Sequence, residues 1–305
     1  MPPAIAVDNL AHRYGTHEAL RGVSREVGDG EIVGLLGPNG GGKTTLFRIL
    51  STLLPPTSGT VRVAGFDVRV EARDVRRQLG VVFQAPALDP LLPVAANLHC
   101  HGALYGLHGR DLGRRIDALL GALSLADRRD MLVKQLSGGL QRRVEIAKAL
   151  IPNPRVLALD EPSTGLDPNA RREVWDHLYQ RRAEHRTTVL LTTHSMDEAG
   201  LCDRVAILHQ GRLVAMGTPR ELTATVGGEV LWIAARSPET TAARLRAEFG
   251  VTADVVDGRV RIERERAHEF IPAVIEAFPG EIDSVTFARA TLEDVFVRHT
   301  GQRFN

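Results

Sequence analysis

Short apolar runs recur along the first two thirds of the chain, and stretches with helical periodicity separate them. Four of these runs have the length and composition of buried strands, at residues 31–36, 156–159, 188–192 and 204–209. Three of the helical stretches lie at about 43–53, 171–182 and 196–201. Buried strands that alternate with helices predict a mainly parallel α/β sheet for this part of the chain.

Two further regions flank or interrupt this pattern. Residues 5–9 and 19–27 are rich in β-forming side chains, and a turn at Gly15 separates them. Between about 85 and 150 the pattern is predominantly helical, which indicates a helical subdomain inserted among the strands.

The chain changes character after Thr218-Pro219. The predicted elements are strand 229–235, a helix from Ser237-Pro238, strands 251–256 and 259–263, helix 267–278, strand 281–287 and a helix from Thr291. Asp257-Gly258, between the two middle strands, is a type I′ hairpin signal. Up to the last strand, the order β-α-β-β-α-β is that of a ferredoxin-like split fold. We therefore expect one domain at 1–224 and a small α+β domain at 225–305.

Charge and composition exclude several classes of protein. The 305 residues include 38 Lys plus Arg and 37 Asp plus Glu, so nucleic acid is not an expected partner. An apolar fraction of 43% excludes a disordered chain. The apolar runs are far shorter than the roughly 18 residues of a membrane span, and the N-terminus lacks a signal peptide's basic start. With only two cysteines, we expect a cytoplasmic chain with no span of its own.

The most informative segment is glycine-rich and lies between a predicted buried strand and a predicted helix. It fits the pattern G-x-x-x-x-G-K-[ST] with Gly37, Pro38, Asn39, Gly40, Gly41, Gly42, Lys43, Thr44 and Thr45. Glycine lets successive backbone N–H groups turn toward an anion, and the following helix adds the positive end of its dipole. Lys43 would then reach the β- and γ-phosphates of ATP, and the Thr44 hydroxyl would bind Mg²⁺.

A second element is expected to supply the other metal contact. The apolar strand 156–159 is followed by Asp160 and Glu161, and a strand tip places Asp160 at the edge of the sheet where ligands bind in open α/β folds. Asp160 would hold Mg²⁺ through water, and Glu161 would polarise the water that attacks the γ-phosphate.

The sequence Leu136-Ser137-Gly138-Gly139 lies upstream of Asp160, which follows 23 positions after Ser137. Together with the phosphate loop, it resembles the ATPase subunit of an ATP-binding cassette (ABC) transporter over about residues 4–224. The resemblance implies an α/β P-loop NTPase cassette with an antiparallel β subdomain and a helical subdomain. It also implies a homodimer, in which Ser137, Gly138 and Gly139 of one subunit face the ATP bound to the other.

Further residues match the family in order and spacing. Tyr14 resembles the aromatic residue that stacks on adenine, and Gln84 resembles the lid glutamine that touches Mg²⁺ near the membrane partner. The loop from Ser163 to Asp167 resembles the one that crosses the dimer interface, and His194 resembles the switch histidine at the γ-phosphate. The resemblance therefore implies Glu161, His194 and Gln84 as catalytic residues.

Some positions depart from the family pattern. Gly41 and Leu140 stand where other residues are common, and neither removes a catalytic group. Residues 93–97 differ near the expected contact with the membrane partner, which puts that contact in doubt. The tail, 291–301, resembles the C-terminal end of exporter ATPases of the daunorubicin-resistance type. It is interpreted as a module that stabilises the dimer or the membrane-subunit contact, with a plain closing helix as the alternative.

The resulting hypothesis is an ATPase subunit that lies at the inner face of the cell membrane. It would power a separate transmembrane permease subunit that exports a drug-like or lipid-like compound. The alternatives are a non-transport ABC ATPase in translation or repair, an importer ATPase, and a nucleotide switch without useful hydrolysis. Two other patterns, His99-Cys100-His101 with His108 and the pairs Arg114-Arg115 and Arg142-Arg143, are interpreted as solvated helix surfaces rather than a metal site or a nucleic-acid patch.

Overall fold

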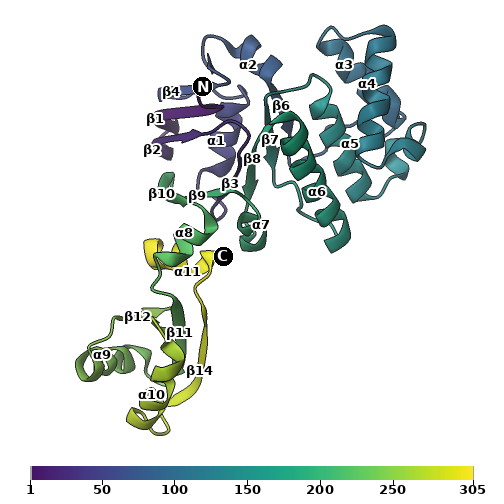
Figure 1. Cartoon of the computed structure of the whole chain (residues 1–305). Helices are drawn as coiled ribbons and strands as arrows, with labels where there is room; N and C mark the ends of the chain where they lie inside the picture. Colours follow the sequence, from purple (N-terminus) through teal and green to yellow (C-terminus); the bar gives the residue numbers. More distant parts are fainter. Residues whose placement is uncertain (1, 305) are drawn as a thin grey trace.

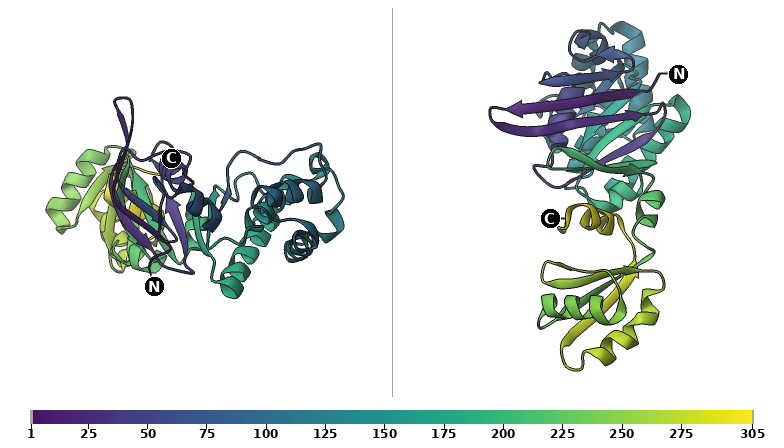
Figure 2. Two further views of the ribbon diagram at one scale, coloured as in Figure 1. Left: turned by 90° about the horizontal axis from the view of Figure 1, so that it is seen from above. Right: turned by 90° about the vertical axis from the view of Figure 1, so that its left-hand side faces the viewer.

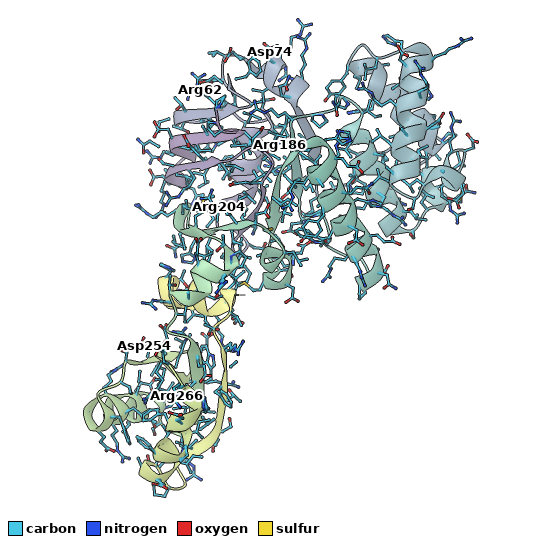
Figure 3. The ribbon with its side chains drawn as sticks, in the orientation of Figure 1. Arg62, Asp74, Arg186, Arg204, Asp254 and Arg266 are labelled. Atoms are coloured by element: carbon cyan, nitrogen blue, oxygen red, sulfur yellow. The ribbon has the colours of Figure 1, made fainter. Side chains whose placement is uncertain are left out.

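The computed structural model describes residues 2–304. Figure 1 shows a larger part and, below it, a smaller part joined to it by two segments of chain. We call residues 2–224 the body and residues 229–289 the module. Figure 3 shows charged side chains of both signs on each, such as Arg62 and Asp74 on the body and Asp254 and Arg266 on the module.

A six-stranded sheet with the order β10-β9-β3-β8-β7-β6 forms the centre of the body. Its strands are β3 (Ile32–Leu36), β6 (Leu79–Val82), β7 (Val156–Asp160), β8 (Thr188–Thr193), β9 (Arg204–His209) and β10 (Arg212–Gly217). The pairs among β6, β7, β8, β3 and β9 are parallel, and β10 is antiparallel to β9. The predicted parallel sheet is therefore confirmed, with one antiparallel strand at its edge.

Both faces of this sheet are covered, which is why its central strands are mainly apolar. Ile32 and Leu36 of β3 face a core that includes Trp175 of α6 (Pro168–His185). Val33 and Leu35 face the opposite core, to which α1 (Lys43–Leu50) contributes Phe47. A strand buried on both sides shows no polar alternation.

The start of the chain forms an antiparallel sheet with the order β2-β1-β4-β5. Its strands are β1 (Ile5–Tyr14), β2 (His17–Val27), β4 (Ser58–Val63) and β5 (Phe66–Asp67). β1 is five residues longer than the predicted strand 5–9. Its pairing with β2 is irregular around Leu10, and Asn9 has a φ of 45°. Such a bulge breaks the two-residue alternation that sequence analysis relies on.

The predicted helical region contains α3 (Val94–Leu104), α4 (Gly109–Ala122) and α5 (Gly138–Leu150), and α2 (Ala72–Gln78) precedes it. Two predicted helices have other bounds in the structure. α1 ends at Leu50 rather than near residue 53, because Thr52 has a φ of 61°, which is not helical. α6 begins at Pro168 because the Asp167 carboxylate accepts hydrogen bonds from the N–H groups of Asn169 and Ala170.

The module has the predicted order of elements. These are β11 (Glu229–Ala235), α9 (Pro238–Phe249), β12 (Ala253–Val256), β13 (Arg259–Arg264), α10 (Ile271–Ala277) and β14 (Ile282–Arg289). The sheet order is β12-β13-β11-β14, antiparallel throughout, which is the ferredoxin-like arrangement. Positive φ angles of 47° at Asp257 and 71° at Gly258 form the predicted I′ turn. Figure 2 shows α9 and α10 on one side of this sheet.

The last helix, α11 (Leu292–Thr300), returns to the body. It lies against α8 (Pro219–Ala224) and α7 (Met196–Gly200). Its buried Phe296 stacks edge-to-face on His209 at the end of β9, with ring centroids 5.4 Å apart. The chain thus passes between the two parts twice, and the predicted domain boundary near residue 224 stays a prediction. Within residues 2–304, no helix has the length and apolar character needed to span a bilayer.

Candidate functional site

The predicted phosphate loop and the predicted catalytic residues lie where parallel strands end. The phosphate loop follows β3, Gln84 follows β6, Asp160 and Glu161 end β7, and His194 follows β8. Because the carboxyl ends of parallel strands meet at one edge of a sheet, these segments lie side by side although they are far apart in the sequence.

The phosphate loop connects β3 to α1, and at Gly37 and Gly42 it lies too close to other backbone atoms for a side chain to fit. A Cβ atom on Gly37 would lie 2.3 Å from the carbonyl oxygen of Leu208. Gly42 has a φ of 106°, and a Cβ there would lie 2.7 Å from the carbonyl oxygen of Ala19. Glycine is therefore required at both positions, and the loop leads directly into the N-terminus of α1.

Lys43 is folded against this loop. Its Nζ donates hydrogen bonds to the carbonyl oxygens of Gly37 at 2.6 Å and Pro38 at 3.0 Å, and the residue is 5% exposed. Burial lowers the pKa of Lys43, while the negative charges of Glu161 and Asp160 act in the opposite direction. Its hydrogen bonds are made to neutral carbonyl groups, so an anion at the loop would offer the ammonium group stronger partners.

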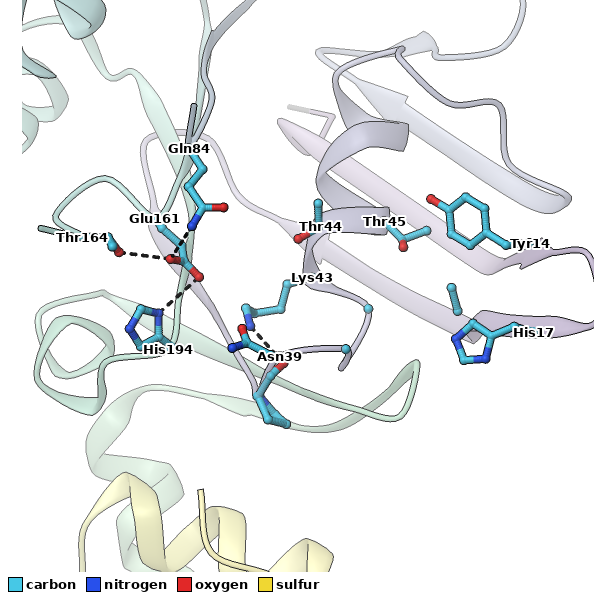
Figure 4. Close-up of a pocket in the computed structure, with 14 residues that line it drawn as sticks. Tyr14, His17, Asn39, Lys43, Thr44, Thr45, Gln84, Glu161, Thr164 and His194 are labelled. Atoms are coloured by element: carbon cyan, nitrogen blue, oxygen red, sulfur yellow. Dashed lines mark hydrogen bonds and ion pairs between the residues drawn. The ribbon is translucent and has the colours of Figure 1, made fainter. Parts of the chain in front are cut away.

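The two carboxylates at the end of β7 have different surroundings. Asp160 is buried, and its Oδ1 accepts a hydrogen bond from the Thr192 hydroxyl at 2.5 Å. Glu161 has a φ of 47°, a left-handed conformation that is strained for a residue with a side chain. With this backbone turn, the side chain of Glu161 lines the pocket drawn in Figure 4, whereas that of Asp160 does not.

Three side chains from different segments meet at the Glu161 carboxylate. Gln84 Nε2 and Thr164 Oγ1 donate to Oε2 at 3.2 and 3.0 Å, and His194 Nδ1 lies 3.2 Å from Oε1 (Figure 4). The structure thus brings together the three predicted catalytic residues, Gln84, Glu161 and His194. Both oxygens of the carboxylate are engaged by protein groups in this conformation.

These groups line one side of a pocket of about 460 Å³. It is lined by Tyr14, His17, Ala19, Pro38, Asn39, Gly40, Gly42, Lys43, Thr44, Thr45, Gln84, Glu161, Thr164 and His194. This volume is in the range of small-molecule and cofactor sites. Tyr14 is 43% exposed and lines the pocket, so a planar group can reach its ring.

Several predicted residues lie outside this pocket. Ser137 caps α5 by accepting a hydrogen bond from the Leu140 N–H at 3.4 Å. Gly138 lines a second hollow of about 200 Å³ on the other side of Glu161. Asp167 caps α6 of its own chain, and neither it nor Gly139 lines the main pocket.

Sequence analysis missed some residues and misread others. Thr192, which holds Asp160, matches no motif. Thr164 belongs to the predicted interface loop 163–167, but its contact with Glu161 in the same chain was not predicted. The interpretation of Arg142 as part of a solvated helix surface is wrong, because it is 8% exposed and bonded to buried carbonyl groups. Among residues 2–304, no group of three or more His, Cys, Asp or Glu side chains is arranged to bind a metal, so His99-Cys100-His101 forms no such cluster.

Comparisons with known proteins agree with this geometry. A family model described as ABC transporter matches residues 20–164. The daunorubicin resistance ATP-binding protein DrrA3 of Streptomyces coeruleorubidus is 41% identical over 304 residues, covering 98% of this chain and 96% of that protein. The Nod factor export ATP-binding protein I of Paraburkholderia xenovorans is 39% identical over 308 residues, covering 98% and 97%.

Among solved structures, cbiO1 of Clostridium perfringens, a part of the ABC transporter complex cbiONQ, matches with a TM-score of 0.68 and 28% identity. The match covers 82% of this chain and 97% of that one. The predicted fold class, an ABC cassette, is confirmed. The relatives do not favour a translation or repair factor, an importer or a non-hydrolysing switch. The chain belongs to the ABC transporter family, as an ATP-binding and ATP-hydrolysing subunit of the exporter type.

Proposed function

We propose that the pocket between the phosphate loop and Glu161 is the site of ATP hydrolysis, with Glu161 as the general base. The observation that carries this assignment is the position of the Glu161 carboxylate, which lines the pocket opposite Lys43 and touches Gln84 and His194. A carboxylate in this place can accept a proton from a water molecule that attacks the γ-phosphate in line.

Each segment has a separate task in this proposal. Backbone N–H groups of residues 39–45 and the Lys43 ammonium group hold the phosphates, and Tyr14 stacks on the adenine. His194 and Gln84 hold the carboxylate of Glu161 in place. Because both of its oxygens are in contact with protein groups, one of these groups must move before a water molecule can take its place.

The residues fit an Mg²⁺ ion bound mainly through phosphate oxygens and water. Asp160 has one oxygen engaged by Thr192, Thr44 lines the pocket beside Lys43, and Gln84 lines it from the other side. Mg²⁺ commonly takes one or two protein ligands besides phosphates and water. We assign Thr44 and Gln84, which line the pocket, to it as direct ligands, and the buried Asp160, which does not line the pocket, to a contact through water. The ion would neutralise negative charge on the phosphates.

A second copy of the chain is proposed to complete the site. Ser137 and Gly139 do not line the pocket of their own chain, although Ser137, Gly138 and Gly139 form the N-terminus of a 13-residue helix suited to an anion. In a homodimer, this helix end and the Ser163–Asp167 loop would face the ATP held by the partner.

The wider function is proposed to be export of a drug-like or lipid-like compound through a separate transmembrane permease, at the cytoplasmic face of the membrane. The names of the similar proteins, which concern daunorubicin resistance and Nod factor export, support this. The test is daunorubicin efflux from cells that express the chain with its membrane subunit. Efflux that is lost with Lys43→Ala supports the proposal, and unchanged efflux without the chain contradicts it.

A further inference from the structure

The guanidinium group of Arg142 connects three segments of the site. Its Nη2 donates to the carbonyl oxygens of Asp160 at 2.7 Å and Glu161 at 3.2 Å. Its Nε donates to the carbonyl oxygen of Pro162 at 3.0 Å, and its Nη1 donates to that of Phe83 at 2.6 Å. One side chain of α5 therefore binds the three consecutive carbonyl groups of residues 160–162. It also binds the carbonyl group of Phe83, the residue that precedes Gln84.

Glu145, one turn further along α5, completes this arrangement. It is 4% exposed, and its Oε2 lies 3.0 Å from Arg142 Nη1. Its Oε1 accepts a hydrogen bond from the backbone N–H of Ala87 at 2.6 Å. The ion pair thus holds the Gln84 loop at both ends, at Phe83 and at Ala87.

The main chain of Glu161 needs such support. Its left-handed conformation is unfavourable and persists only where the surroundings hold it. Thr192 holds the N–H of Glu161 through its hydroxyl and carbonyl oxygens, at 3.0 and 3.2 Å. Arg142 holds the carbonyl groups on the other side. The main chain at Glu161 is therefore held by one residue of β8, Thr192, and one residue of α5, Arg142.

We propose that Arg142, paired with Glu145, is a positioning residue for ATP hydrolysis that fixes Glu161 and the Gln84 loop relative to the helix that begins at Ser137. Both residues lie in the first two turns of α5, behind the Ser137-Gly138-Gly139 end. A shift of that helix end therefore moves the support of the base. This inference rests on the proposed role of Glu161 as the base.

The arrangement requires a guanidinium group. Arginine presents five N–H donors in a planar fork, and here they reach carbonyl groups of two separate segments as well as a carboxylate. A lysine in the same place keeps the charge but presents all its donors from one atom. Arg142→Lys therefore separates the effect of geometry from that of charge.

Arg143→Lys is the matched control, because Arg143 is the next residue of the same helix. Its contacts are the carbonyl oxygen of Leu123 at 3.3 Å and Glu173 at 3.2 Å, both away from the end of β7. We expect Arg142→Lys in the full chain to lower kcat for ATP hydrolysis about tenfold or more, with KM changed by no more than about twofold. Arg143→Lys should leave both within about twofold of the wild type.

Amide hydrogen exchange of the chain without nucleotide gives a second readout. Arg142→Lys should speed exchange in 83–87 and 160–164, while Arg143→Lys should not. Wild-type kcat with unchanged exchange in Arg142→Lys would overturn the proposal. So would equal losses of kcat in the two variants.

Two further variants cover misfolding and separate this inference from the assignment of the base. Arg142→Met with Glu145→Leu leaves no unpaired buried charge and should show the same loss of kcat and faster exchange. Wild-type kcat in this double variant would also overturn the proposal. In a Glu161→Gln background, Arg142→Lys should lower the residual rate no further, and an additional tenfold loss would contradict it. If Glu161→Gln alone keeps the wild-type rate, the assignment of the base fails instead.

Discussion

At the scale of residues, Lys43 and Glu161 are held in place by neighbouring groups that ATP or water would have to replace. Lys43 donates to two carbonyl groups of its own loop. The carboxylate of Glu161 accepts hydrogen bonds from Gln84 and Thr164 and lies 3.2 Å from His194 Nδ1. Neither residue is free to rotate in solvent. The free-energy cost of ordering these side chains is therefore met during folding rather than when ATP binds.

Lys43→Ala should weaken ATP binding by about a hundredfold, because charge-assisted contacts to two phosphates are lost. Lys134, an exposed lysine outside the pocket, offers the control Lys134→Ala, which should bind ATP as the wild type does. Titration calorimetry measures both affinities. An unchanged affinity in Lys43→Ala would refute the role of Lys43.

His101 should make the folded state sensitive to acid. Burial, and then the positive charge of Lys148, lower its pKa from 6.5 to about 4. Protonation of His101 therefore favours the unfolded chain. Its contribution to the free energy of unfolding is fully present above pH 6.5 and is lost as the pH decreases from 6.5 to 4. Urea unfolding should show that His101→Gln loses less stability than the wild type across this range. Parallel losses in both proteins would contradict the prediction.

At the scale of elements, residues close together in the sequence were enough to predict most of the fold and part of the site. The phosphate loop, the strand that ends at Asp160 and the Asp257-Gly258 turn depend on residues close in sequence, and each was predicted. The burial of Arg142 was not predicted, because the carbonyl groups that it contacts belong to Phe83 and residues 160–162, which are distant in the sequence. A helix with an arginine there looks solvated until the distant segments are placed.

The attachment of α11 to the body gives a prediction at this scale. Phe296 is fully buried between His209 and Phe304, so Phe296→Ala should destabilise the region by about 3–5 kcal/mol through the cavity it leaves. Phe287 of β14 is half exposed, and Phe287→Ala serves as the control with little effect. Thermal unfolding and amide exchange over 292–300 measure the difference. Equal effects of the two variants would show that α11 is not anchored by Phe296.

At the scale of the whole molecule, the module is attached to the body through two neighbouring segments of the chain. The N–H of Ala290 donates to the carbonyl oxygen of Gly228 at 3.1 Å, so the two crossings lie side by side. Arg298 of α11 bonds to the carbonyl oxygen of Thr225 and, at 2.9 Å, to Glu263 of β13, which links the module to the body. The module can therefore be removed without separating α11 from the chain.

Deletion of 229–289, with Gly228 joined to Ala290, should leave ATP affinity within about twofold of the wild type, because the pocket is distant from the module. Recovery of the membrane subunit in co-purification should fall, because the module is the larger part of the predicted C-terminal domain 225–305, which we expect to face the membrane partner. Equal recovery with and without the module would count against that role. Lost ATP binding would show that the two parts do not fold independently.

The assignment of Glu161 as the general base is tested most directly by the rate of ATP hydrolysis of Glu161→Gln, measured together with ATP binding and the size of the complex in solution. Glutamine keeps the shape of the side chain and removes the base. We expect hydrolysis to fall by about a hundredfold or more, while ATP stays bound and a dimer accumulates. Hydrolysis at the wild-type rate would contradict the assignment of Glu161 as the general base.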